Sequence, residues 1–246
     1  NDAPSFTASD VTVDEDAGAK TITGWASFTA GPANESSQVV QGYTVSNVTN
    51  GSLLSSGPAV STSGELSFTP EADSNGTVTF EVLVQDDGGN ANGGDDTSPT
   101  QTFTITIDAV NDAPSFTATD QTVDEDAGVQ TVTSWASFTA GPANEISQTE
   151  QRYIIRNVTN GNLLSSGPTV STSGELSYTP AADANGVVTF EVAVQDDGGT
   201  ANGGDDTSPT QTITITIDEV NDAPSFTASD VTVDEDAGAK TITGWA

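Results

Sequence analysis

The chain has 246 residues and carries 36 acidic against only 4 basic side chains, which gives a formal charge of −32 at pH 7. Such a charge repels nucleic-acid phosphates and anionic membranes, so neither is expected as a partner. The absence of cysteine and histidine excludes disulfide bonds, ordinary zinc or copper sites and the common catalytic triads. No signal peptide or apolar run of membrane length is visible, so no membrane insertion is expected.

The sequence is a tandem repeat with a period of 110 residues. The tetrapeptide Asn-Asp-Ala-Pro begins at Asn1, Asn111 and Asn221, and 87 of 110 positions agree between the first two copies. This period is too long for one turn of a solenoid and suits an independent sandwich domain with its own core. We therefore predict sandwich repeats at 1–110 and 111–220, and a partial third repeat at 221–246 that copies residues 1–26 letter for letter.

Alternation of apolar and polar residues predicts half-buried antiparallel strands in the first copy. The clearest is 77–84, in which Val78, Phe80, Val82 and Val84 face one side. Turn signals such as Asn-Gly and Asp-Gly-Gly separate the apolar runs. Seven strands in this length are typical of an immunoglobulin-like sandwich, so we predict an all-β fold. In chain order the predicted strands are 5–8 with 11–13 as a broken first strand, 19–23, 41–48, 53–60, 65–69, 77–84 and 102–107.

The segment from Trp25 to Phe28 breaks this alternation. We expect it to form a helical turn that closes one end of the core, with Trp25 as a core residue. The alternative for Trp25 and its equivalent Trp135 is a surface position that stacks on a sugar ring.

Strand direction concentrates the acidic loops at the two ends of each sandwich. We define the top as the end at which a repeat begins and the bottom as the opposite end. With reversing strands, the loops after the first, fifth and seventh strands lie at the bottom, whereas Asn34, Glu35 and the loop after the sixth strand lie at the top. The side chains expected where the bottom of copy one meets the top of copy two are Asp14, Glu15, Asp16, Asp73, Asp108, Asn111, Asp112, Asp196, Asp197, Asp205 and Asp206. The equivalents are Asp124, Glu125, Asp126, Asp183, Asp218, Asn221 and Asp222 at the second joint, and Asp86 and Asp87 at the top of copy one.

So many carboxylates at close range cannot all stay ionised without a countercharge. Hard oxygen donors, mixed with carbonyls from an irregular linker, suit Ca²⁺ better than Mg²⁺, which prefers small octahedral sites and keeps its waters. A single Asp-Glu-Asp loop would be interpreted as a solvated turn, and solvation is the alternative for Asp16, Asp96 and Asp206. The convergence of four acidic segments on one joint instead predicts a calcium site there.

Four motifs mark the first copy: Leu-Ser-Phe-Thr-Pro at 66–70, Asn-Gly at 75–76, Val-Leu-Val-Gln-Asp-Asp-Gly-Gly at 82–89, and a boundary that ends in Val-Asn-Asp-Ala-Pro at 110–114. Together they resemble the bacterial cadherin-like tandem repeats of large secreted and surface adhesins. The resemblance covers both full repeats and implies cadherin-like sandwiches joined end to end, calcium in the joint and an extracellular location. The ligands that it implies are Glu15, Glu125, Asp73, Asp183, Asn111, Asp112, Asn221, Asp222 and Asp196. The Asp-Arg-Glu pattern of animal cadherins is replaced by Ala-Asp-Ser-Asn at 72–75, which leaves the number of calcium ions per joint open.

We expect no enzymatic activity, because metal binding explains acids duplicated in every repeat better than a glycosidase pair does. The sequence predicts a calcium-rigidified extracellular spacer of a bacterial adhesin or surface fibre. Its partners would be neighbouring repeats of the same chain and identical chains in a fibre. The alternative is a module that binds a polysaccharide or cell-surface glycan, which would need an exposed aromatic platform. The partial third repeat is expected to be disordered or to pair with an open strand edge of another chain.

Overall fold

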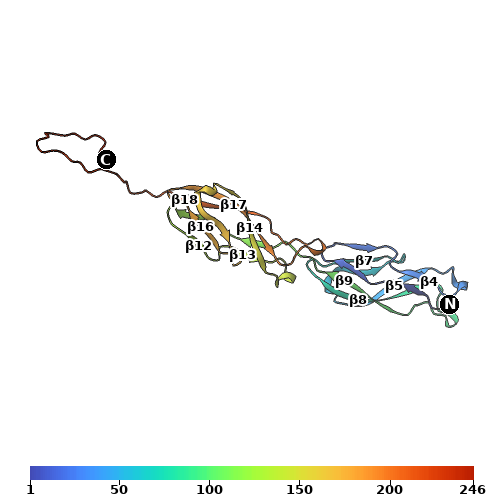
Figure 1. The fold of residues 1–246 in the computed structure, drawn as a ribbon. Helices are drawn as coiled ribbons and strands as arrows, with labels where there is room; N and C mark the ends of the chain where they lie inside the picture. Colours follow the sequence, from blue (N-terminus) through green and yellow to red (C-terminus); the bar gives the residue numbers. More distant parts are fainter.

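The computed structural model describes all residues from 1 to 246 and shows two elongated β-sandwiches arranged end to end (Figure 1). The N-terminus lies at one extreme of the molecule and the C-terminal segment at the other. The predicted all-β fold class is confirmed. No helix in the structure is long and apolar enough to cross a lipid bilayer.

Each sandwich consists of a four-stranded sheet facing a three-stranded sheet, with an additional two-stranded pair. In the first copy the sheet orders are β2-β9-β8-β5, β3-β7-β6 and β1-β4. Within the larger sheet β2 runs parallel to β9, and the other neighbours are antiparallel. The strands are β1 Ser5–Thr7, β2 Val11–Asp14, β3 Lys20–Ile22, β4 Ser27–Thr29, β5 Val40–Thr49, β6 Leu54–Val60, β7 Leu66–Pro70, β8 Gly76–Asp86 and β9 Gln101–Asp108. Three short 3₁₀ turns join them, η1 Ala33–Glu35, η2 Gly51–Leu53 and η3 Ala91–Gly93.

The second copy repeats this topology, with sheet orders β11-β18-β17-β14, β12-β16-β15 and β10-β13. Its strands are β10 Ser115–Thr117, β11 Gln121–Asp124, β12 Gln130–Val132, β13 Ser137–Thr139, β14 Glu150–Thr159, β15 Leu164–Val170, β16 Leu176–Pro180, β17 Gly186–Asp196 and β18 Gln211–Asp218. Its 3₁₀ turns are η4 Ala143–Glu145, η5 Gly161–Leu163 and η6 Ala201–Gly203.

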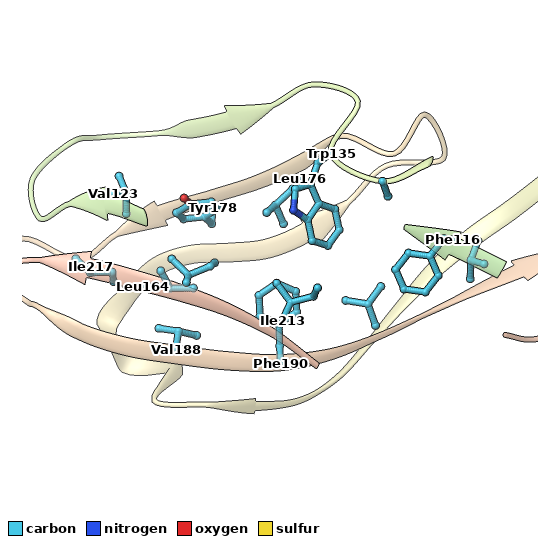
Figure 2. Packing of buried hydrophobic residues seen from close by; sticks show 14 residues of the cluster. Phe116, Val123, Trp135, Leu164, Leu176, Tyr178, Val188, Phe190, Ile213 and Ile217 are labelled. Carbon is cyan, nitrogen blue, oxygen red and sulfur yellow. The ribbon is translucent and has the colours of Figure 1, made fainter. Parts of the chain in front are cut away.

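Strict alternation on β8 builds the centre of the core. Val78, Phe80, Val82 and Val84 are all buried, whereas the residues between them are only half-buried or exposed. The prediction for this strand is therefore confirmed on both faces. In the second copy the equivalent face of β17 packs against Trp135, Leu176 and Ile213 (Figure 2), and the two cores share no residue. Each sandwich thus has its own core.

The expected helical turn from Trp25 to Phe28 is wrong. Residues 27–29 form β4, which pairs antiparallel with β1 in the register Phe6 opposite Phe28. Strand pairing is favoured because it provides hydrogen-bond partners for these backbone groups, which a single helical turn would leave unbonded. The core position of Trp25 is correct: the side chain is buried, and its Nε1 donates to the carbonyl oxygen of Ser9 at 2.8 Å.

Residues 221–246 contain no strand, although they are identical to residues 1–26. In the first copy these residues form β1, β2 and β3, whose partners are β4, β9 and β7. Those partners lie at residues 27–29, 101–108 and 66–70 of the first copy, whereas residues 221–246 reproduce only residues 1–26. As a result Phe226 is 75% exposed, whereas its equivalent Phe6 is 3% exposed. Pairing of this segment with another chain stays a prediction.

Substitution of Phe80 should separate the unfolding of the two sandwiches. The ring of Phe80 is buried and lies 5.9 Å from that of Trp25, so Phe80→Ala should cost about 3–5 kcal/mol in the first sandwich alone. Differential scanning calorimetry should then show two transitions, and Phe190→Ala should lower the other one. One transition that moves as a whole would contradict the independence of the cores.

Candidate cation site between the sandwiches

Three carboxylates from separate elements meet where the first sandwich ends. Oxygen atoms of Asp16, Asp73 and Asp112 all lie within 4.8 Å of one another. Asp16 follows β2, Asp73 lies between β7 and β8, and Asp112 belongs to the linker after β9. We call this group the carboxylate trio. The second joint carries the same trio, Asp126, Asp183 and Asp222.

Local backbone geometry explains why aspartate occupies two of these positions. Asp16 and Asp73 have φ angles of 59° and 52°, in the left-handed region that aspartate tolerates better than most residues. The backbone N–H of Asp73 donates to Asp16 Oδ1 at 3.2 Å. Parallel pairing of β2 with β9 sets Asp14 opposite Asp108, so the loop after β2 and the linker leave the sheet side by side.

Glu15 lies beside the trio but is almost completely buried, with 2% of its surface exposed. Its Oε1 accepts the backbone N–H of Val110 at 2.9 Å. The Nδ2 of Asn144, from the top of the second sandwich, lies 3.3 Å from Oε1 and 3.2 Å from Oε2. Burial raises the pKa of Glu15, and the charges of Asp16 and Asp112 add to that rise. Both carboxylate oxygens therefore have protein donors.

The linker residue Asn111 is held by the top of the second sandwich. Its Nδ2 donates to the carbonyl oxygen of Asp205 at 2.8 Å and to Asp196 Oδ1 at 3.2 Å, and its carbonyl accepts the backbone N–H of Asp205 at 2.8 Å. A Cβ at Gly198 would lie only 1.7 Å from Asn111 Oδ1, so a glycine is needed there. At the top of copy one, Asn1 makes the equivalent contact with Asp86 at 3.1 Å.

Several buried oxygens near this linker lack a hydrogen-bond donor. They are Asn111 Oδ1, Asp112 Oδ2, Glu145 Oε2 and Gln148 Oε1. Glu145 is 5% exposed, and its other oxygen accepts the backbone N–H of Asp112 at 2.8 Å. Asn111, Glu145 and Gln148 also line a cavity of about 170 Å³ together with Glu15. Asn1 Oδ1 and Gln38 Oε1 lack donors in the same way at the top of copy one, so only Asp112 Oδ2 and Glu145 Oε2 are particular to the joint. Buried acceptors without donors are uncommon in folded proteins, and a bound cation would satisfy Asp112 Oδ2.

The titration behaviour reflects the crowding of negative charge. Burial, followed by the charges of Asp16 and Asp73, raises the pKa of Asp112. At the second joint the charge of Asp183 is the main cause of a raised pKa for Asp222. Burial also raises the pKa values of Glu145 and Asp196. Ionisation of Asp112 is therefore disfavoured in the absence of countercharge.

The other predicted ligands lie outside the two trios. Asp87 and Asp197 fasten loops, because they accept the backbone N–H groups of Val39 at 2.9 Å and Thr149 at 2.8 Å. The two hydrogen bonds from Thr149 lower the pKa of Asp197. Asp14 and Asp108 are paired at strand ends, and Asp124 and Asp218 are their exposed equivalents. Asp86 accepts a hydrogen bond from Asn1, and Asp196 accepts one from Asn111. Glu125 accepts Val220 N–H at 2.9 Å, and the side chain of Asn221 donates to Asp222.

Three residues that face the joint were not among the predicted ligands, namely Asn144, Glu145 and Gln148. Reversal of strand direction correctly places their equivalents Asn34 and Glu35 at the top. These residues were missed because the alternation of apolar and polar residues in strands does not show that a glutamate in a loop is buried by the linker.

Residues 111–218 match the bacterial Ig domain family. A search of curated proteins gave no match. Among solved structures, human protocadherin-24 EC1-2 (form II) has a TM-score of 0.56 at 17% identity and covers 90% of this chain and 100% of its own. Mouse cadherin-23 EC22-24 has a TM-score of 0.45 at 16% identity, covering 89% of this chain and 66% of its own. The first of these similarities establishes a cadherin-like tandem fold.

Enlargement of Gly198 should disturb the linker. The Cβ of Gly198→Ala would displace Asn111 from its three hydrogen bonds, so we expect the second sandwich to lose about 1–3 kcal/mol in urea denaturation. Gly42→Ala is the control, because nothing lies within 4 Å of the added methyl. Equal stability of the two variants would contradict the prediction that Gly198 leaves the space that the Asn111 side chain occupies.

With divalent cations removed by chelation, mild acid should stabilise the joint. The pKa values of Glu15, Asp112, Glu145 and Asp196 are raised, so the folded chain binds protons that the unfolded chain has lost. The free energy of unfolding should rise as the pH falls through the raised pKa values of the folded chain. The rise is complete below the ordinary pKa values, which are 4.5 for Glu and 3.8 for Asp. Thermal unfolding from pH 7 downward should show a weaker pH dependence in Asp112→Asn. If the melting temperature depends on pH equally in Asp112→Asn and in the unsubstituted chain, Asp112 does not contribute to the pH dependence of stability.

Proposed function

Because this chain is built from tandem Ig-like, cadherin-like sandwiches of bacterial type, we propose that it is a calcium-rigidified extracellular spacer of an adhesin or surface fibre. The single observation that supports this most strongly is the carboxylate trio at the joint. Two of its members belong to the first sandwich, and Asp112 belongs to the linker. A cation held there would restrict the angle between the sandwiches.

The available donors fit a calcium ion. Asp16, Asp73 and Asp112 would supply hard anionic oxygens, the ligand type that Ca²⁺ prefers. One oxygen of the trio, Asp112 Oδ2, is buried without a hydrogen-bond donor. When bound, the ion would neutralise carboxylates that otherwise repel one another. Glu15, which the cadherin resemblance implies as a ligand, accepts hydrogen bonds at both oxygens, and its Oε2 keeps a lone pair that a cation could use.

A spacer is favoured over a glycan-binding module by the position of the aromatic residues. No aromatic side chain in residues 1–218 is exposed. Trp25, Phe28 and Tyr43, the candidates for a sugar platform, are buried or half-buried and belong to or pack against the core. Sugar recognition through stacking needs an accessible ring face, and the sandwiches offer none. The close similarity of the two copies fits a role in extension, which requires no unique surface. Catalysis is not part of the proposal.

Calcium should stabilise and straighten the chain. Binding only to the folded joint contributes RT ln(1 + [L]/Kd), which is about 1.4 kcal/mol at a tenfold excess over Kd. We expect a higher melting temperature with calcium than with chelator, and a narrower distribution of distances in small-angle scattering. If chelation changes neither quantity, the proposed calcium role is wrong.

Paired variants should localise this effect to the joint. Asp112→Asn removes one trio ligand and should abolish most of the calcium-dependent change in scattering. Asp2→Asn is the matched control, because Asp2 occupies the same place in copy one without Asp16 and Asp73 beneath it. An equal loss in both variants would show that the cation binds within the top of one sandwich.

A further inference from the structure

The sandwiches also make a direct contact that requires no cation. Asn144 Nδ2 of the second sandwich donates to both carboxylate oxygens of Glu15 in the first, at 3.2 and 3.3 Å. Glu15 is separated from Asn144 by 129 positions in sequence. The cavity at the joint is lined from both sides, by Glu15 and Ala109 below and by Asn144 and Glu145 above.

One short turn supplies this contact and a second one. Gly-Pro-Ala-Asn-Glu at 141–145 forms η4, which starts after Pro142, where the ring holds φ at −61°. Asn144 extends to the preceding sandwich, and the next residue, Glu145, accepts the linker N–H of Asp112 at 2.8 Å. Successive residues of η4 therefore bind the predecessor and the linker at the same time.

The environment of Glu15 makes this hydrogen bond significant. The carboxylate is 2% exposed, so water competes poorly for its oxygens. Hydrogen bonds to a charged acceptor are stronger than those between neutral groups, especially where water is excluded. The hydrogen bonds from Val110 and Asn144 hold the Glu15 carboxylate whether or not a cation is bound, because a carboxylate oxygen can accept a hydrogen bond and coordinate a metal at the same time. The contact of Glu15 with η4 is thus chemically separate from the carboxylate trio.

We infer that η4 is a docking element, through which Asn144 of one sandwich binds the buried glutamate of the sandwich before it, while Glu145 holds the linker residue Asp112 as Glu35 holds Asp2 in copy one. The partner that this surface fits is the bottom of another copy of the same repeat, with a glutamate placed as Glu15 is. Docking sets the relative orientation of the two sandwiches without a cation, and the trio stiffens an arrangement that already exists. This role goes beyond the proposed calcium function.

The chain contains its own controls. Asn34 has the position of Asn144 in copy one, and its side chain makes no hydrogen bond in the structure. Glu125 has the position of Glu15 in copy two and accepts Val220 N–H at 2.9 Å, but no asparagine of a following sandwich. Variants at these positions change the same local chemistry without touching the docked contact.

The test compares Asn144→Ala with Asn34→Ala in the whole chain, in the presence of a chelator. Residual dipolar couplings measure whether the two sandwiches align as one body. We expect shared alignment in the unsubstituted chain and in Asn34→Ala. In Asn144→Ala the ratio of docked to undocked joints should fall roughly tenfold, as for the loss of a hydrogen bond to a charged group. Indistinguishable alignment of the two variants would overturn the inference.

A second pair guards against indirect effects. Asn144→Asp places a carboxylate against Glu15 and should undock the joint further, whereas Asn34→Asp should have no effect on alignment. The side-chain amide resonances of Asn144 should shift in Glu15→Gln and stay unchanged in Glu125→Gln. If neither pair behaves in this way, η4 does not dock. Calcium-dependent stiffening that disappears in Asp112→Asn would still support the calcium proposal, so the two ideas fail separately.

Discussion

Mutual repulsion among carboxylates is the constraint on which this molecule depends. The sheet faces are filled with threonine, serine and aliphatic residues, so most of the negative charge lies in loops at the ends of the sandwiches. Two ends meet at the joint, and there Asp112 is pushed against Asp16 and Asp73. The fold can hold them together only because backbone pairing and the linker fix their positions. The joint therefore stores repulsion that binding of a cation or of protons can release.

Hydrogen bonding divides the joint into two parts with different chemistry. Glu15 and the linker backbone form a buried, hydrogen-bonded region with η4 of the next sandwich. The trio, by contrast, presents acceptors to one another, with few donors. Within a few residues, the chain thus passes from a buried carboxylate with hydrogen-bond donors to charged carboxylates with few donors. In the two proposals above, the hydrogen bonds of Glu15 set the relative orientation of the sandwiches, and a cation at the trio sets the stiffness of the joint.

Much of this arrangement could be predicted from the sequence. Alternation on β8 identified the core face, and reversal of strand direction placed Asp16, Asp73 and Asp112 at one end. Two features were not accessible in this way. Residues 27–29 became a strand because β1 supplied a partner, which propensity does not describe. Glu15 and Glu145 are buried, and so are their equivalents Glu125 and Glu35, which have no second sandwich against them in the structure. The loop and linker backbone enclose these glutamates, and strand alternation carries no information on loop burial.

The two residues of the linker act in opposite directions. Asn111 is bound into the sandwich that follows, whereas the carboxylate of Asp112 faces the sandwich that precedes it. A chain made from its N-terminus therefore completes the top of each repeat with that repeat's own first residue. The bottom stays unfinished until the opening residues of the next repeat arrive. Synthesis therefore completes the first trio only with Asp112 and the second only with Asp222, the second residue of the following copy in each case.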